Sequence, residues 1–290
     1  SLGGVNTYTG DTTVSSGTLQ TSVADALANA TAVTVESGAT YDVDANDTIG
    51  SLAGGGNVQL ASGVVLTTGD DDTSTTFSGG LQNTGGLEKI GSGTLTLSGQ
   101  NTYGGPTTVG GGTLRVTGTL SGFTPVTIDS SATYEVVVSD TVASVTGDGI
   151  IDISDGATLT VERSDTDISF AGRIQGSGGF AKAGTNTVTL SGQQTYTGDT
   201  AVDGGTLRVT GNLGGSSADY AGAIALASGA TLEYAETGST QTLSGVITGA
   251  GGLSMTANDG KLALTSVSST FAGGIAVTAG RVEAGASSTD

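Results

Sequence analysis

The chain has 290 residues, 8 Lys and Arg against 27 Asp and Glu, a formal net charge of −19, and neither cysteine nor histidine. This charge would be repelled by nucleic acid and by anionic lipid, and without histidine or cysteine a Ser-His-Asp triad, a Cys-His pair and a disulfide are excluded. The 52 glycines with only 2 prolines exclude collagen. We expect no membrane insertion by this segment, because no apolar run approaches the ~18 residues of a membrane helix.

The first residues already belong to a repeated pattern. Residues 6–10, NTYTG, match QTYTG at 194–198, so the copy at the N-terminus is partial and the chain is expected to be a fragment. Residues 22–31, SVADALANAT, have helical composition, and between strands we expect them to form a loop or one helical turn. From residue 33 the pattern resumes.

The best-preserved part of the pattern runs from residue 85 to 118 and is written again at 178–211, an offset of 178 − 85 = 93 residues without a gap. Leu95 and Leu97 alternate with threonine and serine, which is the period-2 signature of a strand with one buried face. The repeat divides the chain into a partial copy, two full copies and a degraded one, at roughly 1–32, 33–125, 126–218 and 219–290.

Strand-sized segments recur too closely for crossover helices, which leaves a sandwich, a barrel or a coil of strands. Only a coil requires each turn to resemble the next, since successive turns stack ~4.8 Å apart. We therefore predict an all-β parallel β-helix, or β-solenoid, of about a dozen rungs with about four turns per 93 residues, forming a single elongated domain over residues 1–290.

The motif GGLxKxGxGTLTLSGxNTYxGxTxVxxGTL, from Gly85 to Leu114, resembles the autotransporter-associated β-strand repeat of passenger regions in large Gram-negative autotransporters, which use type V secretion. Residues 48–80 resemble the segment that precedes this motif in the same family. The resemblance implies a right-handed β-helical stalk, extracellular on the outer membrane, often serving adhesion, cell aggregation or biofilm formation. It also implies a C-terminal translocator barrel outside this chain.

Asp70, Asp71 and Asp72 form the densest acidic cluster and are candidates for a Ca²⁺ site, because hard oxygen ligands suit that ion. The alternative, which we favour, is a solvated turn. We predict no other metal, no cofactor and no catalytic residue. The carboxylates of Asp165 and Asp167, or those of Asp152 and Asp155, are the pairs from which an acid/base site could be built.

Aromatic residues recur at one place in each copy, before a glycine-containing turn: Tyr8, Tyr103, Tyr196 and Phe271. They could form an exposed row that grips sugars or apolar surfaces, or they could pack over the corner of each copy, which we favour for a scaffold position.

Basic residues recur at the same 93-residue offset, namely Lys89 with Lys182 and Arg115 with Arg208. We expect all four on outward strand faces, where they offset nearby carboxylates.

Two functions of different kinds remain. The first is a non-enzymatic stalk that binds identical stalks, or a glycan or protein ligand on a host or other surface, through its polar flank, or that only spaces a distal binding tip. The second is a polysaccharide lyase or hydrolase, which would need a groove with clustered carboxylates and cations. The scattered single charges favour the stalk, so we predict that the chain is not an enzyme.

Overall fold

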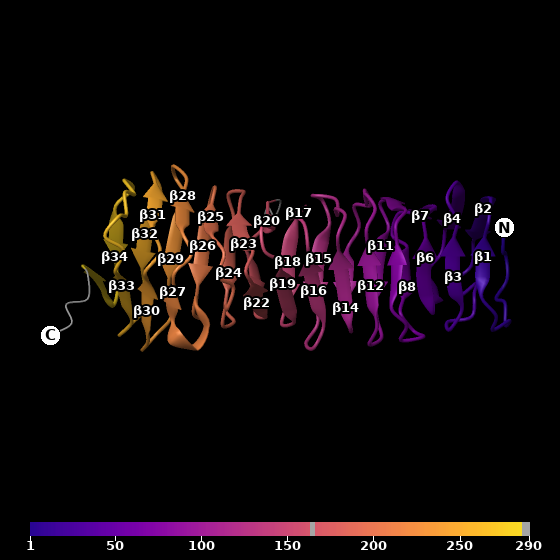
Figure 1. The fold of residues 1–290 in the computed structure, drawn as a ribbon, viewed down its shortest axis with the longest axis horizontal. Helices are drawn as coiled ribbons and strands as arrows, with labels where there is room; N and C mark the ends of the chain where they lie inside the picture. Colours follow the sequence, from indigo (N-terminus) through magenta and orange to yellow (C-terminus); the bar gives the residue numbers. More distant parts are fainter. Residues whose placement is uncertain (163–165, 286–290) are drawn as a thin grey trace. The chain divides into compact units, whose positions relative to one another are not determined.

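The computed structural model describes residues 1–162 and 166–285. Parallel strands stack in about 14 turns of an all-β solenoid, as predicted (Figure 1). The chain divides into two compact units, Ser1–Ala143 and Ser144–Asp290; the prediction of one elongated domain stays a prediction. No helix of the described residues is both long and apolar enough to cross a membrane.

Unit 1 contains three parallel sheets. Their orders are β1-β3-β6-β9-β12-β14-β16, β2-β4-β7-β10 and β5-β8-β11-β13-β15. The strands are β1 Thr12–Val14, β2 Gly17–Thr21, β3 Ala32–Val35, β4 Ala39–Val43, β5 Asp47–Ile49, β6 Ser51–Gly54, β7 Asn57–Leu60, β8 Val65–Thr68, β9 Thr75–Phe77, β10 Gly80–Asn83, β11 Gly86–Lys89, β12 Thr94–Leu97, β13 Thr107–Val109, β14 Thr113–Val116, β15 Pro125–Ile128, β16 Thr133–Val136 and β17 Asp140–Val142.

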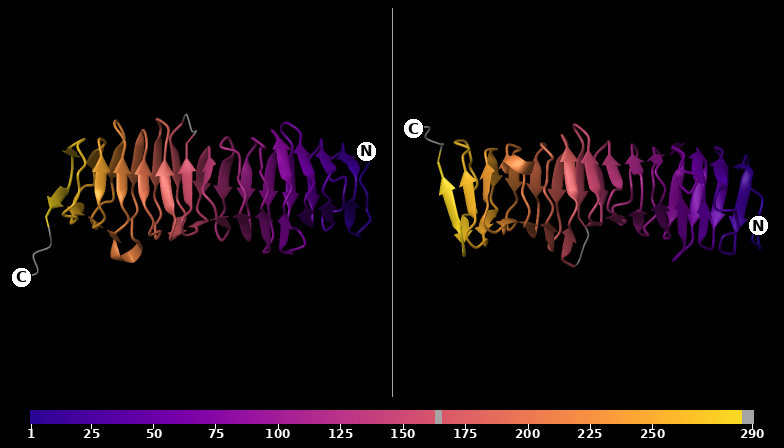
Figure 2. Two further views of the ribbon diagram at one scale, coloured as in Figure 1. Left: turned by 45° about the horizontal axis from the view of Figure 1, so that its top comes forward. Right: turned by 90° about the horizontal axis from the view of Figure 1, so that it is seen from below.

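Unit 2 is also built of parallel strands, in the four orders β18-β21-β24-β26-β29-β32-β34, β19-β22, β20-β23-β25-β28-β31 and β27-β30-β33-β35. The loop that carries its short 3-10 helix, η1 (Gly215–Ser217), projects from the strands in Figure 2. The strands are β18 Ser144–Gly147, β19 Ile150–Ile153, β20 Thr158–Val161, β21 Ile168–Phe170, β22 Arg173–Gly176, β23 Gly179–Lys182, β24 Thr187–Leu190, β25 Thr200–Val202, β26 Thr206–Val209, β27 Asp219–Tyr220, β28 Ile224–Leu226, β29 Thr231–Tyr234, β30 Thr240–Leu243, β31 Ile247–Gly249, β32 Gly252–Met255, β33 Lys261–Leu264, β34 Ile275–Val277 and β35 Arg281–Ala284.

Turn length varies along the chain, and several turns are shorter than the sequence repeat suggested. Leu95 pairs with Leu114, and Leu114 pairs with Tyr134, so one turn takes 114 − 95 = 19 and then 134 − 114 = 20 residues. Four turns in 93 residues would need about 23 each. The structure has about 14 turns beside the dozen or so predicted, because the 93-residue repeat spans slightly more than four turns.

The period-2 alternation correctly identifies the interior. In β12, Leu95 and Leu97 point inward and are buried, while Thr94 and Thr96 are half-buried on the outer face. Each large inward side chain contributes ~1.5–3 kcal/mol through burial. Residues 22–31 form an irregular loop, as expected, and Leu27 anchors it in the interior.

Glycine is required where successive corners stack directly. A Cβ at Gly99 would lie 1.8 Å from the carbonyl oxygen of Gly79 on the preceding turn. No side chain fits there, because real Cβ atoms essentially never come within 3.0 Å of another heavy atom. The glycines of the repeat therefore set how closely its turns stack.

Candidate functional site

The recurring tyrosines of the two full copies lie in the interior. Tyr103 is fully buried and its hydroxyl bonds the Thr107 Oγ1, while the Tyr196 hydroxyl lies 2.7 Å from the Thr200 Oγ1. Burial raises the pKa of Tyr196 to about 12. These two side chains therefore form no exposed aromatic row and pack inside their corners.

The aromatic positions near the two ends of the chain are more open. Tyr8 is 42% exposed and its hydroxyl lies 2.7 Å from the Thr12 Oγ1, whereas Phe271 is half-buried. The hydroxyl pairing with the threonine four residues later is thus shared by Tyr8 and the buried tyrosines.

The carboxylates of Asp71 and Asp72 in the acidic cluster accept hydrogen bonds from neighbouring residues of the chain. Asp70 is exposed; Asp71 Oδ1 accepts hydrogen bonds from the Thr73 amide (2.9 Å) and hydroxyl (2.7 Å). Asp72 Oδ1 accepts from the Ser92 amide (2.7 Å), 20 residues later on the next turn, and this bond lowers the Asp72 pKa. Within residues 1–162 and 166–285, no three His, Cys, Asp or Glu side chains converge as a metal site. The cluster forms a hydrogen-bonded turn, and Ca²⁺ binding stays a prediction.

The proposed acid/base pairs also hydrogen-bond the scaffold. Asp165 lies outside the described residues, and Asp167 Oδ1 accepts the Thr187 amide at 2.7 Å. Asp152 Oδ2 accepts the Gln175 side-chain amide at 2.7 Å, and Asp155 lies exposed in the following turn.

The prediction that the two recurring lysines lie on outward strand faces was wrong. Lys89 and Lys182 are buried, at 1% and 0% exposure. Lys89 Nζ donates to the carbonyl oxygens of Ile90, Gly91 and Gly111, the last lying on the next turn. Burial lowers the pKa of both lysines, and nearby carboxylates oppose the effect. Each buried ammonium group thus has its donors paired with backbone carbonyl oxygens of the corner.

The period-2 alternation of the sequence already indicated that Lys89 is buried. Lys89 is two residues after buried Leu87, so the period-2 pattern places both on the inner face. The arginines behave as expected: Arg115 and Arg208 point outward and pair with Glu135 and Glu233 at 3.7 and 3.4 Å.

A second buried polar set was not predicted. At the start of a turn, a side-chain oxygen accepts the backbone N–H of a leucine or isoleucine on the preceding turn. Asn101 accepts from Leu81 at 3.1 Å and Gln194 from Ile174 at 2.7 Å, each across 20 residues. The residues in this role are Asp47, Asn101, Asp140, Gln194 and Gln241. The signal was present as Asp, Asn or Gln directly before threonine.

The outer face carries a regular polar row in each unit. In unit 1, Thr34 lies in register with Thr13, and Thr96 with Thr76; the row continues through Arg115 and Glu135. In unit 2 the equivalent row is Ser169, Thr189, Arg208, Glu233 and Ser254. We call these the hydroxyl rows. In unit 1, Ala53 of β6 interrupts the row next to Thr34. Because turns stack ~4.8 Å apart, each row offers a polar group to a partner on most turns.

A stacked solenoid with buried corners and polar outer rows is the architecture of a repeat scaffold. Four segments, residues 1–21, 87–116, 180–209 and 256–284, match the family described as passenger-associated-transport-repeat. The two central matches are 180 − 87 = 93 residues apart, as the sequence repeat requires. These matches confirm the resemblance drawn from the motif and support the repeat region of an autotransporter passenger as the class of this chain.

One curated relative extends this finding. Over 100 residues, 34% of the chain, the sequence is 34% identical to a protein named Adhesin BmaC autotransporter from Brucella suis biovar 1 (strain 1330). The match spans 2% of that protein's length, so the chain corresponds to a small part of this relative. No solved structure matches the chain. Together with the repeat family, the relative supports a surface passenger segment.

Proposed function

We propose that this chain is a non-enzymatic stalk segment displayed on the outer membrane of a Gram-negative cell, and that it supports adhesion and biofilm formation by lateral association with identical stalks. The observation that carries the proposal is the hydroxyl row, which presents a polar group on nearly every turn of each unit over a mostly apolar interior.

The proposed association gains strength from repetition. A single hydroxyl contact contributes little, because it replaces a bond to water. Once one turn docks on a neighbouring stalk, the next turns are held at high effective concentration, and weak contacts add. The named adhesin relative is consistent with this role.

The test is homotypic clumping of beads that carry the chain, mixed with bare beads, with Ca²⁺ or a chelator present. In the variant Thr34→Glu with Thr96→Glu, like charges meet across the row of a chain that already carries −19, so clumping should fall. The matched control is Thr40→Glu with Thr108→Glu, which makes the same charge change at outward positions of the other two sheets of unit 1.

Each result has a defined meaning. Clumping of coated beads that is lost in the hydroxyl-row variant and kept in the control supports the proposal. If coated beads stay dispersed at every salt level, the segment is a spacer. If clumping falls equally in both variants, the added negative charge alone prevents association, and the hydroxyl row has no specific role.

A further inference from the structure

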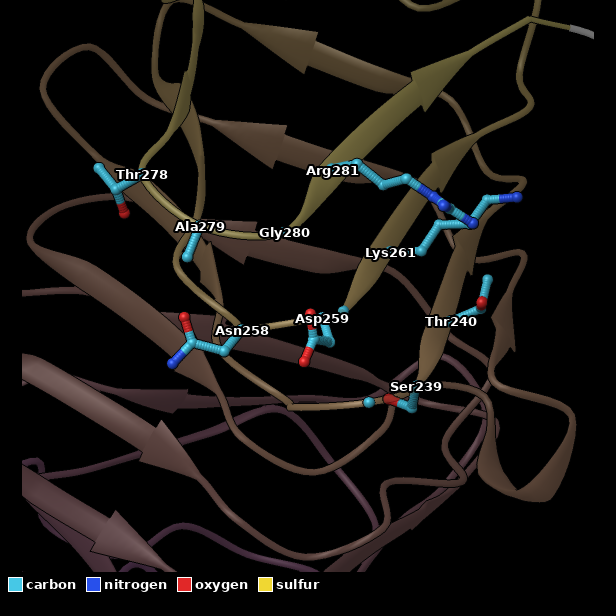
Figure 3. Close-up of a pocket in the computed structure, with 11 residues that line it drawn as sticks. Ser239, Thr240, Asn258, Asp259, Lys261, Thr278, Ala279, Gly280 and Arg281 are labelled. Atoms are coloured by element: carbon cyan, nitrogen blue, oxygen red, sulfur yellow. The ribbon is translucent and has the colours of Figure 1, made fainter.

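Unit 2 contains a polar groove of about 580 Å³ across the corners of three successive turns (Figure 3). Its walls come from residues 238–240, 258–261 and 278–281. This volume falls within the ~300–1,000 Å³ typical of ligand sites.

The backbone holds the three corners in register. Gly238, Asp259 and Gly280 each have positive φ, at 71°, 58° and 69°, which turns the chain sharply at each level. The Lys261 amide donates to the Ser239 carbonyl oxygen at 2.8 Å, so adjacent corners are bonded together. The groove is thus built by the stacked fold rather than by one loop.

One side of the groove is basic. Thr240, Lys261 and Arg281 are register partners on β30, β33 and β35. Glu283 binds Lys261 Nζ at 2.6 Å and Arg281 Nε at 3.1 Å, so two cations share one carboxylate. Arg281 is 68% exposed, which leaves the terminal nitrogens of its guanidinium open to a ligand.

The other side of the groove is lined by polar side chains. Asn258 and Asp259 lie at the central corner in Figure 3, and among the described residues neither side chain has a hydrogen-bond partner. Thr278 adds a hydroxyl at the next corner. This wall can accept and donate hydrogen bonds to several hydroxyl groups.

We propose that the groove binds an acidic saccharide, whose carboxylate contacts Arg281 and Lys261 and whose hydroxyls contact Asn258 and Asp259. Arginine recognises carboxylates in a bidentate manner, and amide and carboxylate oxygens suit sugar hydroxyls. The stacking step of ~4.8 Å lets successive turns meet successive sugar residues.

The test measures binding of the immobilised full chain to tetragalacturonate, a uronic acid polymer fragment, and to sialyllactose, an animal-type acidic glycan. Their neutral counterparts, the galacturonate methyl ester and lactose, are measured beside them. The two acidic probes distinguish a bacterial or plant polysaccharide from a host glycan. We expect at least one acidic probe to bind about tenfold or more tightly than its neutral counterpart.

The variant Lys261→Gln with Arg281→Gln should weaken that binding at least about tenfold, because both contacts to the carboxylate are removed. The control Arg115→Gln with Arg208→Gln removes the same charge from outward, glutamate-paired arginines and should bind as the parent does.

No binding of either acidic probe, unchanged binding in the groove variant, or equal loss in the control would each overturn the assignment. Because the hydroxyl-row variants leave the groove intact, they should retain saccharide binding even where bead clumping fails. The two proposals therefore stand or fall separately.

Discussion

Asp140 makes the stability of unit 1 depend on pH. The residue is 5% exposed, and its carboxylate accepts hydrogen bonds from the amides of Leu120 and Thr141 and from the Tyr134 hydroxyl. Burial raises its pKa from 3.8 to about 6 and outweighs these donors, which favour the ionised form. Burial also raises the pKa of Tyr134, so that hydroxyl stays protonated.

The direction of the pH dependence follows from the linkage between proton binding and folding. The folded state binds this proton more tightly than the unfolded chain does, so the stabilisation is complete below about pH 4 and is lost as the pH rises to about 6. The gap between 3.8 and about 6 corresponds to about 3 kcal/mol. Asp140→Asn should remove this dependence and be more stable than the parent at pH 8 by up to that amount. Asn101 fills the equivalent role in the same unit, so the fold already accepts asparagine there.

The assay is urea unfolding between pH 4 and 8, read by circular dichroism, together with hydrogen exchange of the Leu120 and Thr141 amides, corrected for intrinsic rates. The local readout is needed because stacked repeats can unfold in parts. Asp129→Asn, in an exposed turn, is the control. Parent stability that is flat or rises from pH 4 to 6.5, or an Asp140→Asn variant that is weaker at pH 8, would refute the reasoning.

Two further predictions concern the corners. Gly99→Ala should lower the free energy of unfolding, measured in urea, by about 3 kcal/mol or more, because the new Cβ would overlap a backbone carbonyl. The control Gly10→Ala, where the Cβ meets open space, should lower it by less than about 0.5 kcal/mol. Equal losses of stability in the two variants would contradict the stacking argument. Acetylation of the folded chain should modify Lys261 but spare Lys89 and Lys182, which peptide mass spectrometry resolves. Rapid native labelling of either buried lysine would contradict their placement.

The sequence was sufficient for the architecture because the relevant signal is local. Leu95 and Leu97 alternate with polar residues, and the alternation alone identifies the buried face of β12. The 93-residue repeat indicated stacking. Dividing that repeat into four whole turns overestimated the length of several turns, because a repeat in sequence need not contain a whole number of turns. The length of each turn is set by its strand pairing, such as that of Leu95 with Leu114.

The polar interior was harder to predict because its partners are on other turns. Lys89 looked like a surface charge, since the carbonyl of Gly111 that it binds is 22 residues away. The groove of unit 2 is invisible in the sequence for the same reason: Asp259 and Arg281 become neighbours across one opening only when their turns stack. Residue type predicted exposure correctly for Arg115 and wrongly for Lys89, and the place of each in the alternation of its strand explains the difference.

The buried polar groups bear on how the stack keeps its register. Rows of leucine and valine can pack against one another with little loss if a strand pairs with the wrong turn, because apolar contact is not directional. Hydrogen bonds are directional, and an unpaired buried polar group costs ~1–3 kcal/mol. The Asn101 side-chain oxygen accepts a hydrogen bond only when the Leu81 amide lies on the preceding turn. The Lys182 ammonium group needs the Asn186 side chain and the backbone carbonyls of its own corner. A misregistered turn would leave these groups unsatisfied, so we infer that they select the native pairing in a chain with no cysteine to fix it.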